Sequence, residues 1–390
     1  MILDKCGLIG WHKIEAIILS AIVARKPILL VGPPGVAKTD SASRISRAVQ
    51  GAKCSFKSYD TPALDASDLL GVFNPASLAK GEIDFIQTPL SVWGATSILL
   101  DEINCCSPLV AAKLHELIRQ QEVMGLPTNV ELVWAAINPP AQYQTNFMSI
   151  PLASRFVTLD VPSLADLSDE DLAKIMVSDL NKKPPKYTKK IKAARNVVLS
   201  ERTTTSVQKV VTTILRQLKQ SNDTIKSLEG RTAKYMYELI CGFIAVKSVF
   251  KNIHLDDALV KLVISLIPEM NKAVRLETDF DTPLLTNIIR EATSLLEVGP
   301  EYEVESFVEL LKVEIVDELN WIKVGTSLIQ NEKELSRVEK CNALVRKAKI
   351  PDHIKSTLKQ QMKNHIIDIC LSKGSYSTKR IKEVMDGFRM

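Results

Sequence analysis

Eight residues, Gly32-Pro-Pro-Gly-Val-Ala-Lys-Thr39, limit what this 390-residue chain can fold into more than any other stretch. They follow a short apolar run at 27–31 and precede residues 40–49, whose pattern is helical. Gly32 and Gly35 let the backbone turn tightly enough for successive N–H groups to surround an anion. A helix that starts just after the loop points the positive end of its dipole at the same place. The pattern predicts a strand, a phosphate-binding loop and a helix.

The last residues of the loop have distinct expected roles. Lys38 would reach the β- and γ-phosphates of a nucleotide, and the Thr39 hydroxyl would be a ligand of Mg²⁺. Ala37 stands where this pattern usually has glycine, and we expect a near-helical backbone there that accommodates the methyl group. The residues expected to hold ATP in this loop are Gly32, Pro33, Pro34, Gly35, Val36, Ala37, Lys38 and Thr39. A fortuitous Gly/Pro turn is the alternative interpretation.

Two adjacent carboxylates, Asp101 and Glu102, follow the apolar run 98–100. Side chains of neighbouring residues at a strand end point in different directions, so one can hold a metal ion while the other faces water. We expect Asp101 to bind Mg²⁺ and Glu102 to orient and deprotonate the attacking water. By itself such a pair is more often found at the start of a helix. Downstream of a phosphate-binding loop, it favours hydrolysis of ATP.

Five apolar segments predict strands, and helical segments alternate with them. The predicted strands are 27–31, 54–59, 96–100, 131–137 and 156–161. This alternation is typical of an α/β fold with a parallel sheet covered by helices. Ligands of such sheets bind at the carboxyl ends of the strands, where the polar motifs of this chain occur.

Asn138 and Arg155 are further candidates near strand ends. The amide of Asn138, after the fourth predicted strand, could lie between the attacking water and the γ-phosphate. A turn-forming asparagine before proline is the alternative. Arg155 precedes the fifth predicted strand, and from the residues alone a surface salt bridge is the simpler interpretation.

The pattern changes after the first 165 residues, which we expect to form the nucleotide-binding domain. Residues 166–195 are expected to hold one helix, 166–180, and a Lys/Pro-rich linker, 181–195. For this basic stretch, a solvated linker is favoured over a phosphate-contacting patch. Residues 196–270 have a helical pattern, and 271–390 are expected to form a further helical domain of unknown role.

Composition excludes several classes of protein. The net charge of +5 does not by itself indicate nucleic-acid binding, and no apolar run approaches the length needed to span a membrane. The first residues lack the pattern of a signal peptide. Seven cysteines without metal-binding spacing indicate reduced thiols and a cytoplasmic location. For Cys105 and Cys106, two small half-buried residues are favoured over a redox switch.

Together these motifs resemble those of AAA+ ATPases of the MoxR/RavA branch, over residues 7–268. Members carry a loop similar to GPPGxAKT, a DEIN motif like that at 101–104, and two short β-hairpin inserts, to which 81–89 and 123–127 are similar. The resemblance implies a P-loop NTPase (AAA+) core, 1–165, with an all-α lid, 196–270. Departures from the family pattern are Thr88 and Ser154, and Cys105-Cys106 in place of Arg-Ala.

The resemblance also implies roles for single residues. Asn138 matches the sensor 1 asparagine, and Arg155 matches the arginine that acts on the nucleotide of a neighbouring subunit. Of two candidates for the sensor 2 arginine, Arg202 and Arg231, we choose Arg231 for its spacing to Asp256. The backbone at Ile9 and Gly10 is expected to contact adenine.

Relatives of this branch usually form hexamers, work with von Willebrand A-type partners and remodel or mature protein complexes. The resemblance thus implies a ring-forming ATP hydrolase that acts on a protein partner, with ATP and Mg²⁺. The alternative is a nucleic-acid motor or loader, for which the basic stretch 181–195 and the basic tail beyond Arg346 are the only support. A nucleotide-gated scaffold without turnover is disfavoured because Glu102 is present.

Overall fold

The structure is a computed structural model that describes residues 2–81, 84–139, 146–177, 183–197, 199–221, 228, 230–250, 253, 255, 257–270 and 282–297. Most of the predicted C-terminal domain and Asp256 therefore lie outside the described residues. Contacts group residues 1–195 and 201–298 into one unit and residues 196–200 and 299–390 into a second. The account that follows concerns the first unit.

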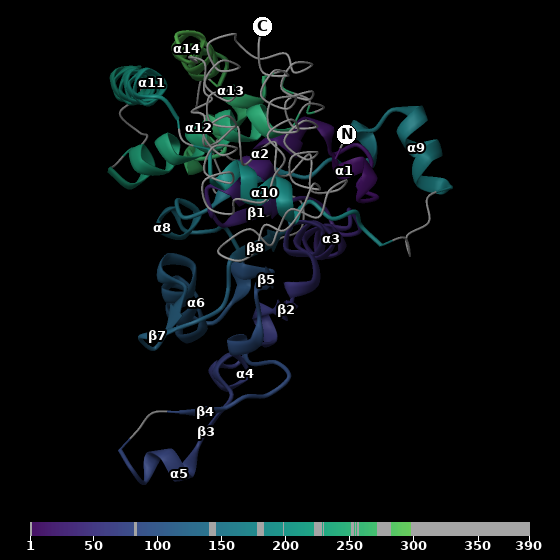
Figure 1. The fold of residues 1–390 in the computed structure, drawn as a ribbon, viewed down its shortest axis with the longest axis vertical. Helices are drawn as coiled ribbons and strands as arrows, with labels where there is room; N and C mark the ends of the chain where they lie inside the picture. The colour runs from purple at the N-terminus through teal and green to yellow at the C-terminus, as the bar shows by residue number, and fades with distance from the viewer. Residues whose placement is uncertain are drawn as a thin grey trace, which may run out of the picture. The chain divides into compact units, whose positions relative to one another are not determined.

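A five-stranded sheet forms the centre of this unit, as predicted (Figure 1). Its strand order is β2-β5-β8-β1-β9, and all paired neighbours are parallel. The strands are β1 (Ile28–Val31), β2 (Phe56–Asp60), β5 (Ser97–Asp101), β8 (Leu132–Ile137) and β9 (Val157–Asp160). Each agrees with the corresponding predicted strand to within two residues at either end. The central strands β1 and β8 are buried along their whole length, which explains their uninterrupted apolar sequences.

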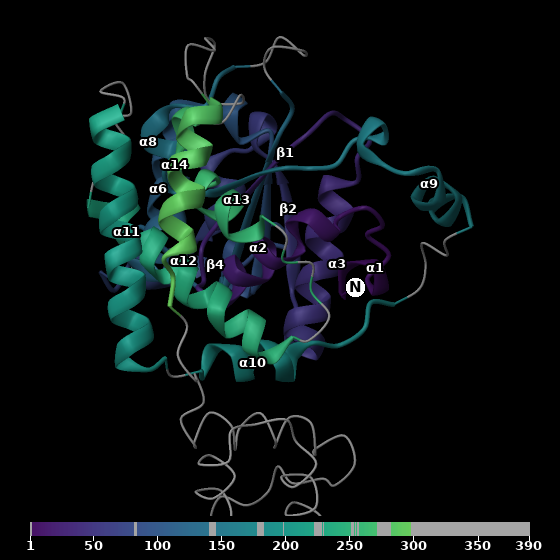
Figure 2. The same ribbon diagram turned by 90° about the horizontal axis from the view of Figure 1, so that it is seen from above.

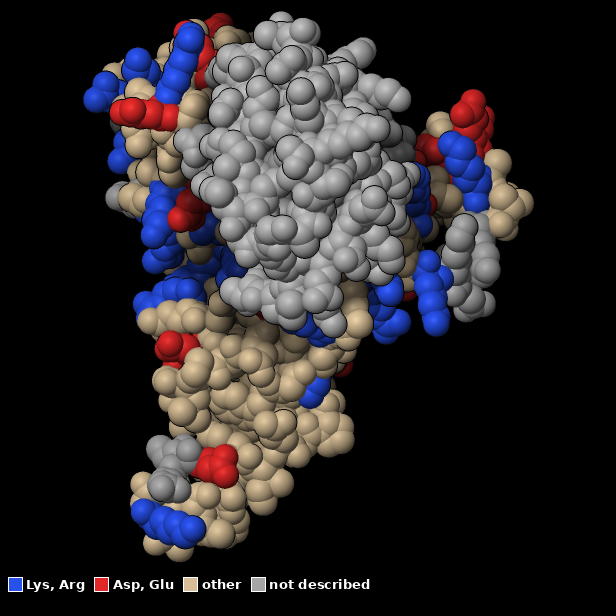
Figure 3. Space-filling view, in the orientation of Figure 1, with Lys and Arg blue, Asp and Glu red and all other residues tan. Residues whose placement is uncertain are grey.

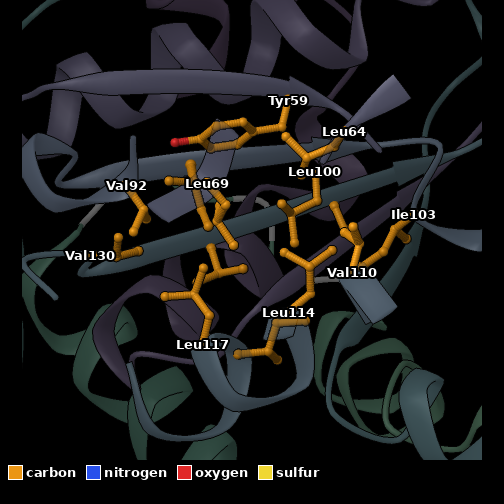
Figure 4. Packing of buried hydrophobic residues seen from close by; sticks show 14 of the residues in the cluster. Tyr59, Leu64, Leu69, Val92, Leu100, Ile103, Val110, Leu114, Leu117 and Val130 are labelled. Atoms are coloured by element: carbon orange, nitrogen blue, oxygen red, sulfur yellow. The ribbon is translucent and has the colours of Figure 1, made fainter. Parts of the chain in front are cut away.

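Helices cover the sheet and bury its apolar side chains. Those nearest to it are α2 (His12–Val23), α3 (Lys38–Gln50) and α6 (Pro108–Gln120). Figure 4 shows Leu114 and Leu117 of α6 packed against Leu100 of β5 and Leu69. On another side, the indole of Trp134 in β8 donates a hydrogen bond to Ser46 of α3 (3.0 Å). The carboxyl ends of the strands are thereby held in fixed register.

Two short hairpins extend the core at the positions where the sequence predicts inserts. The first pairs β3 (Val72–Phe73) with β4 (Phe85–Ile86) and carries α5 (Pro75–Leu78) between them. In Figure 1 it lies beyond α4 (Ala66–Leu70), away from the sheet. The second pairs β6 (Glu122–Val123) with β7 (Leu126–Pro127) directly after α6. Both break the simple alternation of strands and helices.

Five helices from the second half of this unit pack together, as Figure 2 shows. They are α10 (Thr188–Arg195), α11 (Glu201–Ser221), α12 (Gly230–Val249), α13 (Ala258–Ile264) and α14 (Thr282–Ser294). Helix α12 also packs closely along α2 of the core. There the backbone carbonyl of Ser20 lies within 2.9 Å of where a Cβ at Gly242 would be. Glycine therefore allows the close approach of these two helices.

Several short elements complete the described residues. They are α1 (Ile2–Lys5), α8 (Ile150–Ala153), α9 (Asp169–Met176) and the 3₁₀ turns η1 (Gly51–Lys53), η2 (Thr61–Ala63), η3 (Val92–Gly94), η4 (Ile103–Cys105), η5 (Leu164–Asp166) and η6 (Pro268–Met270). Within the residues described, no helix is both long and apolar enough to cross a membrane.

The structure corrects two predictions for residues 166–195. The helix predicted at 166–180 is α9, and it begins only at Asp169, because Ser168 caps its start by accepting a hydrogen bond from the Asp171 amide (3.2 Å). The predicted solvated linker is helical from Thr188 and buries Ile191 against the core. Apolar residues among the lysines account for this packing.

Candidate functional site

The loop from Gly32 to Ala37 leaves the carboxyl end of β1 and enters α3, as the sequence predicts. Gly35 has φ +84°, a conformation that strains residues with a side chain. A Cβ at Gly32 would come within 3.2 Å of Val161 and 3.1 Å of Val36, so the limited space favours glycine there. These two glycines give the loop its tight turn.

The backbone conformation of Ala37 differs from the one that we expect from the sequence. Its backbone has φ 59° and ψ 32°, which is the left-handed region and not the near-helical conformation expected from the sequence. Glycine adopts this region freely, whereas alanine is strained there by about 1–2 kcal/mol. The loop therefore holds a strained residue directly before the lysine.

Lys38, the first residue of α3, is buried, and its side chain contacts the loop. Its ammonium donates hydrogen bonds to the carbonyl oxygens of Gly32 (2.7 Å) and Pro33 (3.0 Å) and to Oδ1 of Asn138 (2.9 Å). Burial lowers the pKa of Lys38, and the carboxylates of Asp101 and Glu102 oppose this shift. The lysine thus joins the loop to the residues that follow β5 and β8.

Asp101 is the last residue of β5 and faces the start of α3. The hydroxyl of Thr39 donates a hydrogen bond to Oδ2 of Asp101 (3.2 Å), so the two oxygens expected to bind Mg²⁺ lie side by side. The buried hydroxyl of Thr61, after β2, donates to the backbone carbonyl of Asp101 (2.7 Å) and fixes its position. A hydroxyl and a carboxylate are hard oxygen donors of the kind that Mg²⁺ prefers. The residues present therefore fit a magnesium ion.

Glu102 and Asn138 meet between β5 and β8. The side-chain nitrogen of Asn138 donates to Oε1 of Glu102 (3.3 Å), while its oxygen accepts from Lys38. Glu102 has φ 52°, a left-handed backbone that directs its side chain away from that of Asp101. The strand register explains the meeting, because Asp101 pairs with Ala136 and Val31 pairs with Ile137. Lys38, Glu102 and Asn138 form one connected polar group at this edge of the sheet.

Cys105 and Cys106 lie just beyond this group. Both are free thiols, half-buried, and the amide of Cys105 donates to the carbonyl of Glu102 (2.8 Å). Burial raises the pKa of the Cys106 thiol, which keeps it protonated and less reactive. This favours the interpretation as two small half-buried residues.

Arg155 lies at the amino ends of the strands, whereas the loop lies at their carboxyl ends. It precedes β9, which runs parallel to β1 with Val157 beside Ile28. The distance along the strands from Arg155 to the loop is about 15–20 Å, because a strand rises roughly 3.3 Å for each residue. This exceeds the reach of an arginine side chain. Arg155 and the Lys38 loop therefore cannot meet on one phosphate within one chain.

Arg231 lies in the first turn of α12 and near Arg155. Burial, and next the charge of Arg231, lower the pKa of Arg155. The other candidate, Arg202, is exposed on α11 and forms an ion pair with Glu297 (2.8 Å). Of the two candidates, Arg231 and not Arg202 is the one whose charge affects the pKa of Arg155.

The segment expected to contact adenine packs against the residues that follow β9. Gly10 has φ +83°, and a Cβ there would come within 2.1 Å of the Leu167 side chain. The carbonyl of nearby Cys6 accepts a hydrogen bond from Arg44 of α3 (3.3 Å). Ile9 and Gly10 thus lie between α3, which starts at the phosphate loop, and the turn at Leu167.

Some residues of interest were missed by sequence reasoning. Thr61 is one of them, and its place just after the predicted strand 54–59 was the available signal. His115, Arg119 and Tyr235 were also missed: burial and then the charge of Arg155 lower the pKa of His115, and Tyr235 and Arg119 have smaller, opposite effects on the pKa of Arg155. No local pattern in the sequence marks these three residues.

Comparison with known proteins identifies the domain that holds the loop. Residues 27–156 match the family described as AAA domain (dynein-related subfamily). A crystal structure of an inferred ATPase from Cytophaga hutchinsonii is similar, with a TM-score of 0.54, 20% identity, and coverage of 76% of this chain and 94% of that one. At this identity the likeness concerns the fold. A full-length MCM homolog from Methanopyrus kandleri has a TM-score of 0.40 and 12% identity, and the match covers 74% of this chain and 55% of that one.

No curated protein matches the sequence. The matched segment runs from the residue before β1 to the residue before β9, so it contains the loop, both carboxylates, Asn138 and Arg155. Its fold is the parallel sheet with helices that the resemblance to the MoxR branch predicts. By this match, residues 27–156 form an AAA domain of the dynein-related type.

Proposed function

We propose that this chain hydrolyses ATP at the carboxyl edge of its sheet. The observation that supports the proposal most directly is the connected polar group there: Lys38 contacts Asn138, Asn138 contacts Glu102, and Thr39 contacts Asp101. The start of α3 and the ends of two strands, β5 and β8, supply these side chains. Such an arrangement places an anion site, a metal site and a basic carboxylate next to each other.

The loop and its neighbours would bind the nucleotide. Backbone N–H groups of residues 35–37 and of the start of α3 would surround the phosphates, and Lys38 would leave the Gly32 and Pro33 carbonyls to bind phosphate oxygens. Thr39 and Asp101 would hold Mg²⁺, which would supply positive charge to the phosphate oxygens. Ile9 and Gly10 would contact adenine through their backbone.

Glu102 would accept the proton of the attacking water. Its carboxylate is held by the side chain of Asn138, so both groups would face the outermost phosphate together. In the nucleotide complex the side chain of Asn138 would orient the water together with Glu102, after Lys38 has moved to the phosphates. Positioning and charge stabilisation of this kind account for most of the rate in phosphoryl transfer.

Arg155 and Arg231 would act on the nucleotide of a neighbouring subunit. Arg155 lies at the edge of the sheet away from its own loop. An arginine supplied by a neighbour can raise the rate of phosphoryl transfer by about 10³–10⁵. A head-to-tail arrangement that gives every loop such an arginine closes into a ring, and a hexamer is the ring expected from the resemblance.

The ring would couple hydrolysis to the remodelling or maturation of a protein partner, such as a von Willebrand A-type protein. The β3–β4 hairpin supports a protein partner, because it exposes Val72, Phe73 and Ile86 together with Leu78 of α5. Figure 3 shows few charged side chains on the surface around α4 and α5. Exposed apolar side chains on a projecting insert suit contact with another polypeptide. Helices α10–α13 would serve as the lid that moves with nucleotide state.

Two substitutions test the hydrolytic site in the full chain. Lys38→Ala should abolish ATP binding, whereas Glu102→Gln should bind ATP and lose turnover by at least about 100-fold. The matched control is Glu291→Gln, which neutralises an exposed acid on α14. ATP binding is measured by equilibrium titration and turnover by phosphate release. Turnover by Glu102→Gln at the rate of the unsubstituted chain would contradict the proposal.

The nucleic-acid motor gains no specific support from the described part of the basic stretch. Arg195 pairs with Glu131 (3.4 Å) and donates to the Ile22 carbonyl (3.1 Å), and Lys190 lies 5.7 Å from the centre of the Phe250 ring. These side chains take part in packing. Stimulation of turnover by DNA, with a steep dependence on salt, would favour the motor.

A further inference from the structure

The side chain of Arg44 connects the helix that starts at the phosphate loop to the segment expected to contact adenine. Arg44 lies on α3, six residues after Lys38, which is about 9 Å along the helix at roughly 1.5 Å for each residue. Its Nη1 donates a hydrogen bond to the backbone carbonyl of Cys6 (3.3 Å), directly after α1. Figure 2 shows α1 beside α3. The contact therefore joins two parts of the chain that would hold different parts of one nucleotide.

A second contact fixes the orientation of the Arg44 guanidinium. Its Nε donates to Oδ2 of Asp40 (2.6 Å), one turn earlier on α3 and directly after Thr39. Although it is charged, Arg44 is only 9% exposed. A charged group buried to this degree is costly unless hydrogen bonds and an opposite charge compensate it. With acceptors at Asp40 and Cys6, the guanidinium is held between α3 and the end of α1.

The end of α1 is a glycine turn that packs on this guanidinium. Gly7 has φ +82°, and its amide donates to the carbonyl of Asp4 (2.9 Å). The amide of Leu8 donates to the carbonyl of Leu3 (3.0 Å), which completes a common helix-ending motif. A Cβ at Gly7 would come within 3.2 Å of Nη1 of Arg44. Glycine thus allows the close approach of the turn and the guanidinium.

Only a short stretch separates this turn from the residues expected to contact adenine. Ile9 and Gly10 follow Gly7 by two and three residues, and α2 begins at His12. The side chains on either side of them, Leu8 and Trp11, are buried. Close-packed interiors transmit a displacement from one residue to the next. The position of the turn therefore sets the position of the backbone at 9–10.

We propose that Arg44 is a positioning residue for the base of the nucleotide: it holds the turn at Gly7 against α3, and so sets where the backbone of residues 9–10 lies relative to the phosphate loop. The inference rests on the proposed function, and adds to it a residue that neither the sequence motifs nor the family resemblance assigns. Backbone groups bind a base more tightly when they are already in place before it arrives. Arg44 itself would touch neither the base nor the phosphates.

A long-range effect of the Arg44 charge on the phosphates is the competing explanation. The charge is paired with that of Asp40, so the field of the pair at the loop is weak. Inorganic tripolyphosphate separates the two explanations, because it has the three phosphates of ATP but no base. A charge effect would lower the affinities for ATP and for tripolyphosphate alike. Positioning of the base segment would lower the affinity for ATP alone.

The first test compares three variants of the full chain. Arg44→Ala should weaken ATP binding about tenfold, as expected for the loss of one or two hydrogen bonds to the base, and tripolyphosphate binding less than about twofold. Its KM for ATP should rise while kcat changes less than about twofold, because the lost contact is shared by ground state and transition state. Arg44→Lys, which keeps the charge without the paired donors, should lose an intermediate amount of ATP affinity. Arg47→Ala removes an exposed arginine from the same helix and is the control with both affinities unchanged.

The second test alters the other side of the same contact. Gly7→Ala places a Cβ against the guanidinium of Arg44 and should reproduce the selective loss of ATP affinity. Its matched control is Gly125→Ala: Gly125 has φ +72°, and among the described residues a Cβ there meets nothing within 4 Å. The double variant, Gly7→Ala with Arg44→Ala, should bind ATP within about twofold of Arg44→Ala, because both changes act through one contact.

Equilibrium titration with ATP and with tripolyphosphate gives outcomes that distinguish the inference from the proposed function. An unchanged affinity of Arg44→Ala for ATP, or an equal loss of affinity for both ligands, would overturn the inference and leave the ATPase proposal intact. Failure of the unsubstituted chain to bind ATP would instead contradict the proposed function. Normal tripolyphosphate binding by Arg44→Ala shows that the loop and α3 retain their fold. If Arg44→Ala does not fold, Arg44→Lys and Gly7→Ala decide the question against their controls.

Discussion

Ala37 illustrates how a single residue sets the properties of the phosphate loop. It has the left-handed backbone conformation in which glycine is favoured, and it lies directly before Lys38. The strain is tolerated because Lys38 is held by three hydrogen bonds on the other side of the peptide. Strained backbone of this kind commonly occurs at functional sites, where surrounding contacts determine it.

Relief of this strain can be measured. Ala37→Gly should raise the free energy of unfolding by about 1 kcal/mol, the cost of a Cβ in the left-handed region. Ala42→Gly, in the interior of the same helix, should lower it by about the same amount, because glycine weakens a helix. Urea unfolding of the two variants provides the comparison. A decrease in stability for Ala37→Gly would contradict the assigned conformation.

Asn138 connects Lys38 to Glu102, the proposed catalytic carboxylate, and its removal should separate binding from chemistry. We expect Asn138→Ala to lower the maximal turnover about 100-fold, in the range seen when one side-chain donor to a reacting group is lost. The affinity for ATP should change only a few-fold, because the loop amides and Lys38 remain. Turnover and binding measured on the same preparation test this. A large loss of affinity with unchanged maximal turnover would assign Asn138 to binding instead.

At the scale of elements, the packing of α1 depends on a buried acid in α2. Glu15 is fully buried, and its carboxylate accepts hydrogen bonds from the amides of Leu3 (2.7 Å) and Ile2 at the start of α1. Its second oxygen, Oε2, has no hydrogen-bond partner among the described residues. Burial raises the pKa of Glu15 above its ordinary value of 4.5, and the two amides only partly oppose this shift. Free amides at a helix start need such an acceptor.

The raised pKa has a definite sign in its effect on stability. Because folded Glu15 binds a proton more tightly than unfolded Glu15, its contribution to stability is largest at and below pH 4.5 and declines as the pH rises through the folded pKa. Glu15→Gln keeps an acceptor for the amides without the charge. The stability of the unsubstituted chain relative to Glu15→Gln should therefore fall as the pH rises from 4.5 towards neutrality. Urea unfolding at a series of pH values measures this difference, and a constant difference would contradict the assignment.

At the scale of the whole molecule, the two halves of the proposed catalytic machinery lie at opposite edges of one sheet. The loop, Asp101 and Glu102 lie at the carboxyl ends of the strands. Arg155 lies at their amino ends, and the charge of Arg231 affects its pKa. No movement of a side chain can join them within one chain, since about 15–20 Å of strand separates them. Catalysis would then depend on assembly.

Dependence on assembly predicts how turnover varies with protein concentration. Turnover for each chain should rise through the concentration range in which the chain assembles, because each neighbour supplies Arg155. Arg155→Ala should bind ATP normally and lose turnover by about 10³-fold, with no further rise on assembly. Phosphate release and light scattering measured over the same dilution series test this. Turnover that is independent of concentration, in a chain that dissociates over that range, would refute the shared site.

The sequence by itself determined the parallel sheet, the loop and the residues at its carboxyl edge. These follow from local patterns: apolar runs of strand length, glycines in a tight turn, and polar residues directly after strand ends. Because parallel strands align their carboxyl ends, local motifs alone bring Lys38, Asp101 and Asn138 together. The sequence alone therefore predicts that these residues, although far apart in the chain, lie at one site.

Only the tertiary structure decided the rest. The left-handed backbone of Ala37 and the packing of α10 against the core both depend on contacts between elements that share no sequence pattern. A lysine-rich segment is interpreted as a solvated linker unless the structure shows a surface that its few apolar residues can cover. Long-range packing sets these features, and periodicity and spacing do not encode it.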